Sequence, residues 1–246
     1  MKIVFKNNIK NVLIRGYRQY LRFSSKPFNQ LLNQALLTAE GKCSQEDIRK
    51  ELADFYQKFD DAALKQLINF SHNKKVLGDN YKMDLFDITQ YRIGFFNNIQ
   101  KRFIKLVRHK NIRLDIVRLN KYAQIPPYMH SGVVSGFYVL EGKVAIRHYD
   151  QVSLSRESAR IKKSIDTTLT AGSFTTNSEY KDNIHWLNSL ADETYLVRFN
   201  VTHIPNARFP LNSDNPRTFI NPVNEHSEGE YDAKLIDEKA AKSLSF

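Results

Sequence analysis

The chain has 246 residues, of which 41% are apolar, and it carries 37 Lys and Arg against 26 Asp and Glu. This composition is enough to build a core and excludes wholesale disorder, and no apolar run reaches the roughly 18 residues of a membrane-spanning helix. The only cysteine, Cys43, excludes an internal disulfide framework and a Cys-rich zinc or iron–sulfur site, and it favours a reducing compartment.

Most of the net charge of +11 comes from residues 1–26. Seven basic residues precede the first acidic residue, Glu40, whereas the rest of the chain carries 30 basic and 26 acidic residues. An acid-free, Arg-bearing segment that ends in Ser24 and Ser25 has the composition of a mitochondrial targeting segment. We therefore expect a basic arm and a mitochondrial location; a basic helix that belongs to the fold is the alternative.

Residues 27–110 carry helical patterns. Apolar residues recur at helical spacing after Phe28, Gly41 ends that segment, and Ser44 with Asp47 forms a capping-box pattern for the next. Asp60 or Asp61 can cap a short third helix. A longer pattern over 87–110 has an apolar residue at every fourth position. The sequence therefore predicts a helical region over 27–110.

The pattern changes to a period of two at residue 111. Strand-like runs cover 112–119, 137–140, 144–149, 167–169 and 195–202, and Pro126-Pro127, Glu141-Gly142 and Ala171-Gly172 are expected turns. Short strands separated by such turns predict an antiparallel β-sandwich or barrel over 111–205. Residues 206–246, rich in Pro and polar residues, are expected to form an extended or helical tail on the surface or around a partner.

Two separated motifs carry chemical information. Residues 125–150, with His130 after Pro126-Pro127 and a Glu141-Gly142 turn, resemble the first motif of a cupin. Residues 172–188, with Asp182-Asn183-Ile184-His185, resemble the second. Within the cupins, the chain resembles the cysteamine dioxygenase and plant cysteine oxidase family of thiol dioxygenases over about residues 112–204. Ser135 stands where many cupins carry Glu, a departure that this family shares.

The resemblance implies a jelly-roll barrel after the helices, giving an α+β fold, and a ferrous ion held by three histidines beside a thiol and dioxygen. Carried over by position, His130 and His185 are two of the metal ligands. The first ligand position is Tyr128. Tyr128 could ligate iron as a phenolate, could pack in the pocket and leave two histidines, or could reflect a turn aligned one or two residues out of register. His148 and His203 could point inward as replacement ligands.

Three functions follow as hypotheses. The first is a thiol-dioxygenase-like cupin with a degenerate metal site, serving as an accessory subunit of a larger, mitochondrial assembly. The second is a working Fe(II) dioxygenase that oxidises cysteamine or cysteine thiols to sulfinic acid. The third, a nucleic-acid-associated protein, rests only on charge, and no nucleic-acid motif supports it. Protein subunits and a small thiol are thus the expected partners, without a membrane span.

Overall fold

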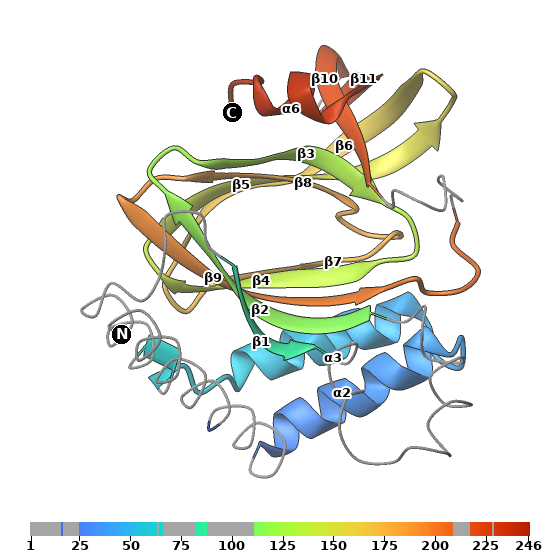
Figure 1. Ribbon diagram of the computed structural model, residues 1–246. Helices are drawn as coiled ribbons and strands as arrows, with labels where there is room; N and C mark the ends of the chain where they lie inside the picture. Colours follow the sequence, from blue (N-terminus) through green and yellow to red (C-terminus); the bar gives the residue numbers. More distant parts are fainter. Residues whose placement is uncertain are drawn as a thin grey trace, which may run out of the picture.

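The computed structural model describes residue 16 and residues 25–62, 64–65, 82–87, 111–208, 217–227 and 229–246 (Figure 1). The order is helices, then strands, then one short helix: α2 (Lys26–Ala39), α3 (Gln45–Gln57), β1 (Lys82–Asp87), β2 (Asn111–Asn120), β3 (Gln124–His130), β4 (Val134–Glu141), β5 (Lys143–Leu154), β6 (Ser158–Thr170), β7 (Phe174–Asn177), β8 (Ile184–Ser189), β9 (Glu193–Thr202), β10 (Arg217–Ser227), β11 (Glu230–Ile236) and α6 (Glu238–Lys242).

The two N-terminal helices begin and end where their capping residues predict. Ser25 caps α2, and its hydroxyl accepts from the Phe28 N–H. Gly41 follows α2 with a positive φ of 72°, a conformation that glycine adopts without strain. The capping box of α3 is confirmed, because Ser44 and Asp47 each accept a hydrogen bond from the other's N–H. Residues 62, 64 and 65 are also helical, at the start of the expected third helix.

The strands form two antiparallel sheets. One has five strands in the order β1-β2-β9-β4-β7, and the other closes as a barrel in the order β10-β11-β6-β5-β8-β3. Figure 1 shows β3, β8 and β5 facing β9, β4 and β7 across the jelly roll, with α2 and α3 on the outer side of the five-stranded sheet. The prediction of an α+β fold, with helices followed by a cupin-type jelly roll, is confirmed.

The largest apolar cluster joins the helices to the five-stranded sheet. It contains Phe28 and Leu31 of α2, Leu52 of α3, and the alternate residues of β2 and β9 that face the helices. Gly136 allows this close packing, because a Cβ there would lie 2.9 Å from the Leu52 Cδ2 atom and 2.8 Å from a backbone oxygen. The other faces of the same strands point into the jelly roll, which determines which side chains can reach the site.

Two expectations need correction here, and a third is not tested. Residues 82–87 lie in the segment predicted to be helical, but they form β1, which pairs with β2. Pro126 and Pro127 lie inside β3 and not in a turn. The β3–β8 register shifts between Ile125 and Tyr128, where proline has no N–H to donate to the ladder. The long pattern over 88–110 lies outside the described residues.

The segment after Pro205 is also more than a surface tail. β10 pairs with β3 and with β11, and β11 pairs with β6. Ile220 and Ala233 are buried in a cluster with Met129, Ile161 and Ile184. The hairpin of β10 and β11 therefore shares a buried apolar cluster with β3, β6 and β8. Pro222 and several Asn residues obscured the pattern, and the β10–β11 register shifts just after Pro222.

Candidate functional site

The structure brings all three residues of the expected site together. Tyr128 and His130 lie on β3, and His185 lies on β8 directly opposite Tyr128 in the register. Their side chains face the interior of the jelly roll, where the ring centroid of Phe137 on β4 lies 5.5 Å from that of His185. The two motifs, 55 residues apart in sequence, meet because β3 and β8 are neighbouring strands.

Tyr128 packs edge-on against both histidines. Its ring centroid lies 4.7 Å from that of His130 and 4.6 Å from that of His185, and the two imidazoles are 5.2 Å apart. Phe219 of β10 closes another side at 5.5 Å. The Arg217 Cζ atom lies 5.0 Å from the Tyr128 ring centroid, within range of a cation–π interaction. Tyr128 is only 4% exposed.

A third histidine faces the same interior. His148 of β5 is the register partner of His185, and their ring centroids are 6.2 Å apart. Because β8 lies between β5 and β3, His148 and Tyr128 stand on opposite flanks of His185. Strand parity left an inward direction open for both His148 and His203, and only His148 has it. The other candidate, His203, is exposed and follows the end of β9.

His148 and His185 are fully buried, and neither ring nitrogen of either residue has a hydrogen-bond partner among the described residues. Burial lowers the pKa of His185 well below its ordinary value, and the nearby His130, His148 and Arg217 add to this effect. Burial also lowers the pKa of His148 to about 4, against the opposing attraction of Asp182 and Asp150. Both imidazoles are therefore neutral near pH 7.

The donor set does not fit the three-histidine ferrous site that the resemblance implies. Tyr128 occupies the first ligand position, and His148 lies on the far flank of His185. Among the residues that the structure describes, no group of three or more His, Cys, Asp or Glu side chains is arranged to hold a metal ion. The guanidinium of Arg217 also brings a charge of the same sign as the metal close to Tyr128.

Asn183 fixes the position of His130, a role that the sequence did not reveal although Asn183 lies within the second motif. Its Oδ1 accepts from the His130 N–H at 3.0 Å, and its Nδ2 donates to the His130 carbonyl at 3.1 Å. Asn183 Nδ2 also donates to Gln151 Oε1 at 3.3 Å. This amide holds the start of β8 against the end of β3, so it sets the distance between the two motif histidines.

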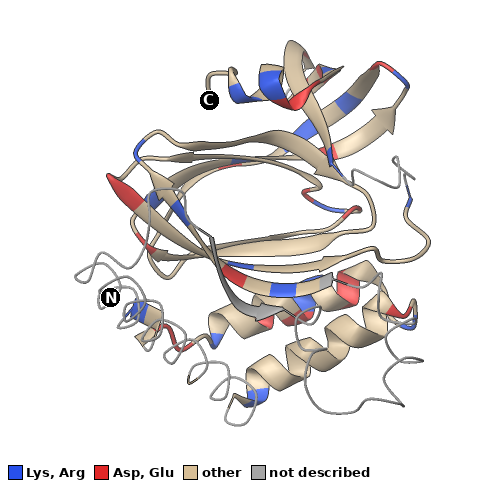
Figure 2. Cartoon of the chain, in the orientation of Figure 1, with Lys and Arg blue, Asp and Glu red and all other residues tan. Residues whose placement is uncertain are grey.

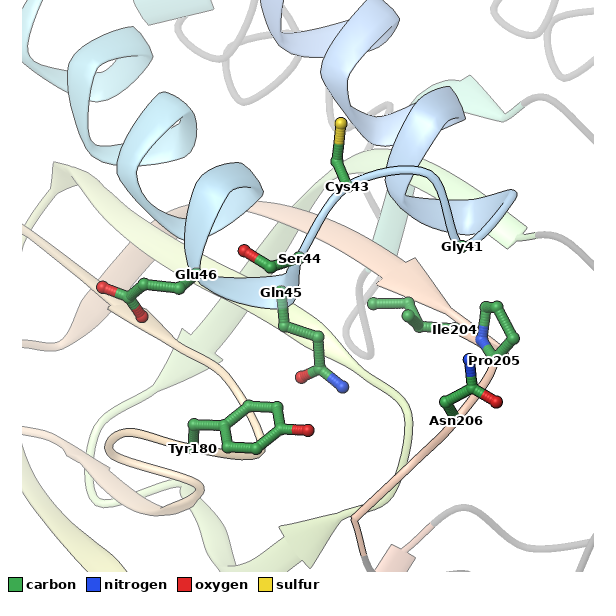
Figure 3. Close-up of a pocket in the computed structure, with 9 residues that line it drawn as sticks. All are labelled: Gly41, Cys43, Ser44, Gln45, Glu46, Tyr180, Ile204, Pro205 and Asn206. Carbon is green, nitrogen blue, oxygen red and sulfur yellow. The ribbon is translucent and has the colours of Figure 1, made fainter.

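An open pocket of about 390 Å³ lies outside the jelly roll, between the start of α3 and the turn after β9 (Figure 3). Its lining includes Cys43, Gln45, Tyr180 and Pro205. The Gln45 side chain donates to the buried carboxylate of Glu179 at 2.9 Å, and Glu179 accepts from Ser131, the neighbour of His130, at 3.3 Å. Gln45 and Glu179 thus connect the lining of this pocket to the residue next to His130.

The sequence matches no protein-family model and no curated protein. Among solved structures, the chain is similar to the cupin domain of Cnp3 from Schizosaccharomyces pombe, with a TM-score of 0.29 and 11% identity over 37% of this chain and 56% of that chain. KdgF from Halomonas sp. matches with a TM-score of 0.29 and 10% identity over 40% of this chain and 84% of that one. A cupin superfamily protein from Desulfitobacterium hafniense matches with a TM-score of 0.29 and 9% identity over 51% of this chain and 78% of that chain.

Structural similarities with TM-scores this low do not indicate the activity, ligands or partners of this chain. The assignment of a cupin-type jelly roll therefore rests on the strand order and on the inward-facing motif residues described above. Among the helices that the structure describes, none has the length and apolar character needed to cross a bilayer.

Proposed function

We propose that this chain is a thiol-dioxygenase-like cupin that has lost the metal site of that family and serves as an accessory subunit of a larger protein assembly. The observation that supports the loss is the packing of Tyr128. At the first ligand position the chain has a buried phenol ring that packs edge-on against both His130 and His185. A phenol thus stands where the resemblance implies the third imidazole ligand of a ferrous ion.

The assembly part of the proposal rests on the acid-free arm of residues 1–26 together with a site that lacks the family's donors. We propose a mitochondrial location on the same arm. A chain that keeps a folded cupin barrel without its metal chemistry retains surfaces that can contact other subunits.

One observation favours a second candidate function, the working iron thiol dioxygenase. His148 and His185 are neutral and buried, and their ring nitrogens lack partners among the described residues. Neutral imidazoles are good ligands for Fe(II), and bound iron would supply the oxidation of a thiol to a sulfinic acid. In that case Tyr128 or His148 would complete the set with His130 and His185.

Anaerobic loading with Fe(II), followed by measurement of iron per chain, separates the two candidates. We expect the wild-type chain to hold no more iron than His185→Ala. We also expect Tyr128→His to gain iron, because it restores the third imidazole at the first ligand position. Near-stoichiometric iron in the wild type that disappears in His185→Ala would contradict the loss of the site and would support the dioxygenase.

The assembly is tested by gel filtration of a native extract, with the chain detected by antibody. We expect elution together with a much larger complex, and elution only as a free chain would contradict the proposal. Fractionation of cells that express the full chain or a version without residues 1–26 tests the location. The full chain is expected with mitochondria, and the shortened chain outside them.

A further inference from the structure

The C-terminal segment, residues 237–246, is a thin layer on the barrel. Figure 1 shows α6 and the C-terminus beside β3, on the side of the barrel opposite to α2 and α3. All residues of the segment are described, and among them only Ala241 is buried. α6 itself has five residues, whereas isolated helices shorter than about 12 residues are marginal in water. Contacts with the barrel must therefore hold the segment in place.

The first contact lies at the histidine site. α6 packs against β3 and β10, and Ala241 shares a buried apolar cluster with Tyr128 of β3 and Phe219 of β10. The ring of Tyr128 also contacts His130 and His185. α6 therefore contributes to the burial of the aromatic ring that lies next to both motif histidines.

The second contact is made by Phe246. Its ring centroid lies 5.3 Å from that of Trp186, and the Arg147 Cζ atom lies 4.3 Å from the Phe246 centroid, within range of a cation–π interaction. Arg147 and Trp186 are register partners on β5 and β8. Because Trp186 follows His185 in β8, its side chain points to the opposite face of the sheet. The C-terminal segment thus also covers part of that opposite face.

The hydrogen bonds of the segment are internal. Asp237 Oδ1 accepts from the Ala240 N–H at 2.7 Å, and Lys242 pairs with Glu238 within α6. Among the described residues, no hydrogen bond joins residues 238–246 to the rest of the chain. The segment is therefore held to the barrel mainly by its apolar and aromatic contacts.

Charge adds little to this attachment. In Figure 2, β3 carries no Lys, Arg, Asp or Glu beside α6. The hydrogen bond from Lys242 lowers the pKa of Glu238, and the charge of Arg217 adds to this effect. Because Glu238 is exposed, solvent weakens its attraction to Arg217.

We propose that residues 237–246 form a detachable cover that closes the Tyr128 side of the histidine site. A segment with few buried side chains and no hydrogen bonds to neighbouring elements opens locally at a much lower free energy than the whole fold. When the cover opens, Tyr128 and Trp186 become accessible to solvent, while the sheets keep their own hydrogen bonds. The C-terminus, which lies outside both motifs, then controls access to the histidines from this side.

Hydrogen exchange of the full chain, followed by mass spectrometry, tests whether the cover detaches. We expect residues 238–246 to exchange about tenfold faster or more than β10 and β11. Phe246→Ala is expected to raise the exchange rate of residues 238–246 by about another tenfold, because it removes one of the two contacts, and to leave β8 unchanged. Ser245→Ala is the matched control, since Ser245 is exposed, and its exchange should equal that of the wild type.

Nitration with tetranitromethane, located by peptide mass spectrometry, tests whether the cover closes the site. In the wild type we expect Tyr122, which is 67% exposed, to react, and the buried Tyr56 and Tyr128 to react slowly. Phe246→Ala and a chain that ends at Ile236 should each raise the nitration of Tyr128 about fivefold or more and leave Tyr56 unchanged. Circular dichroism checks that the shortened chain is folded.

Several results would overturn the inference. Exchange of residues 238–246 as slow as that of β10 and β11 would show that α6 belongs to the core, and exchange at the rate of an unfolded peptide would show that the cover does not form. Unchanged nitration of Tyr128 in both variants, or an equal increase at Tyr56, would show that the segment does not close the site separately. These measurements do not involve iron, so their failure leaves the proposed function untouched.

Discussion

At the scale of single residues, one hydroxyl group joins the helical layer to the five-stranded sheet. The Tyr56 hydroxyl accepts from the Phe199 N–H at 3.1 Å and lies 2.9 Å from the Gly136 carbonyl oxygen and 3.1 Å from that of Val197. Burial raises the pKa of Tyr56 above its ordinary value. We expect Tyr56→Phe to lower the free energy of unfolding by about 1–3 kcal/mol, because it leaves buried backbone groups unsatisfied.

Urea denaturation measures this effect, and Tyr122→Phe is the control. Tyr122 is 67% exposed, so removal of its hydroxyl is expected to change the free energy of unfolding by less than about 0.5 kcal/mol. Equal stability of the wild type and Tyr56→Phe would show that water or relaxed packing satisfies these groups.

The buried histidines predict a pH dependence of stability. The pKa of His148 is lowered to about 4 in the fold, against about 6.5 in an unfolded chain. Between these values the unfolded chain binds a proton that the folded chain does not. The free energy of unfolding should therefore fall as the pH drops from about 6.5 to 4, by up to about 1.4 kcal/mol per pH unit for one such histidine. The lowered pKa of His185 acts in the same direction.

Denaturation curves at several pH values between 4 and 7 test this dependence in the wild type, His148→Leu and His203→Asn. We expect the free energy of unfolding of His148→Leu to depend less on pH, because this variant lacks one of the two histidines whose pKa is lowered by folding. His203 is exposed and serves as the control, with Asn chosen because the backbone there has a positive φ of 58°. An unchanged slope in His148→Leu would mean that this ring is protonated in the fold as readily as in the unfolded chain.

At the scale of elements, patterns of neighbouring residues predicted their helices and strands correctly. Strands whose apolar residues face distant parts of the chain were not predicted. The capping box of Ser44 and Asp47 and the period-2 pattern of β2 are local, and both appear in the structure. β3 was missed because its two prolines suggest a turn when neighbouring strands are unknown. β10 and β11 were missed for a related reason: their apolar residues face a core that only tertiary pairing creates.

The C-terminal hairpin should therefore contribute to stability as a core element. Ile220 is fully buried between β10 and the rest of the barrel. We expect Ile220→Ala to lower the free energy of unfolding by about 2–5 kcal/mol through lost apolar contact and a new cavity. Val223→Ala on the same strand is the control, since Val223 is 38% exposed, and chemical denaturation compares the two. A similarly small decrease in the free energy of unfolding in both variants would show that this segment is a surface tail and not part of the core.

At the scale of the whole molecule, the two motif histidines could be predicted because their spacing reflects the strand order of a known fold. The residues that surround them could not all be predicted. Arg217 and Phe219 belong to β10, a strand outside both motifs, and they reach Tyr128 only because β10 pairs with β3. The chemical character of the site is therefore a property of the assembled barrel.

The helical layer and the barrel also form one folding unit. Ile112, Leu114 and Ile116 of β2 are fully buried, together with Phe199 of β9, and all of them pack in the cluster that contains α2 and α3. A chain of residues 111–246 would expose these side chains, and each loses about 1.5–3 kcal/mol of burial free energy. We expect this fragment to show no cooperative thermal transition in calorimetry, whereas the full chain shows one. A cooperative transition in the fragment, at the same midpoint as the full chain, would show that the barrel folds without its helices.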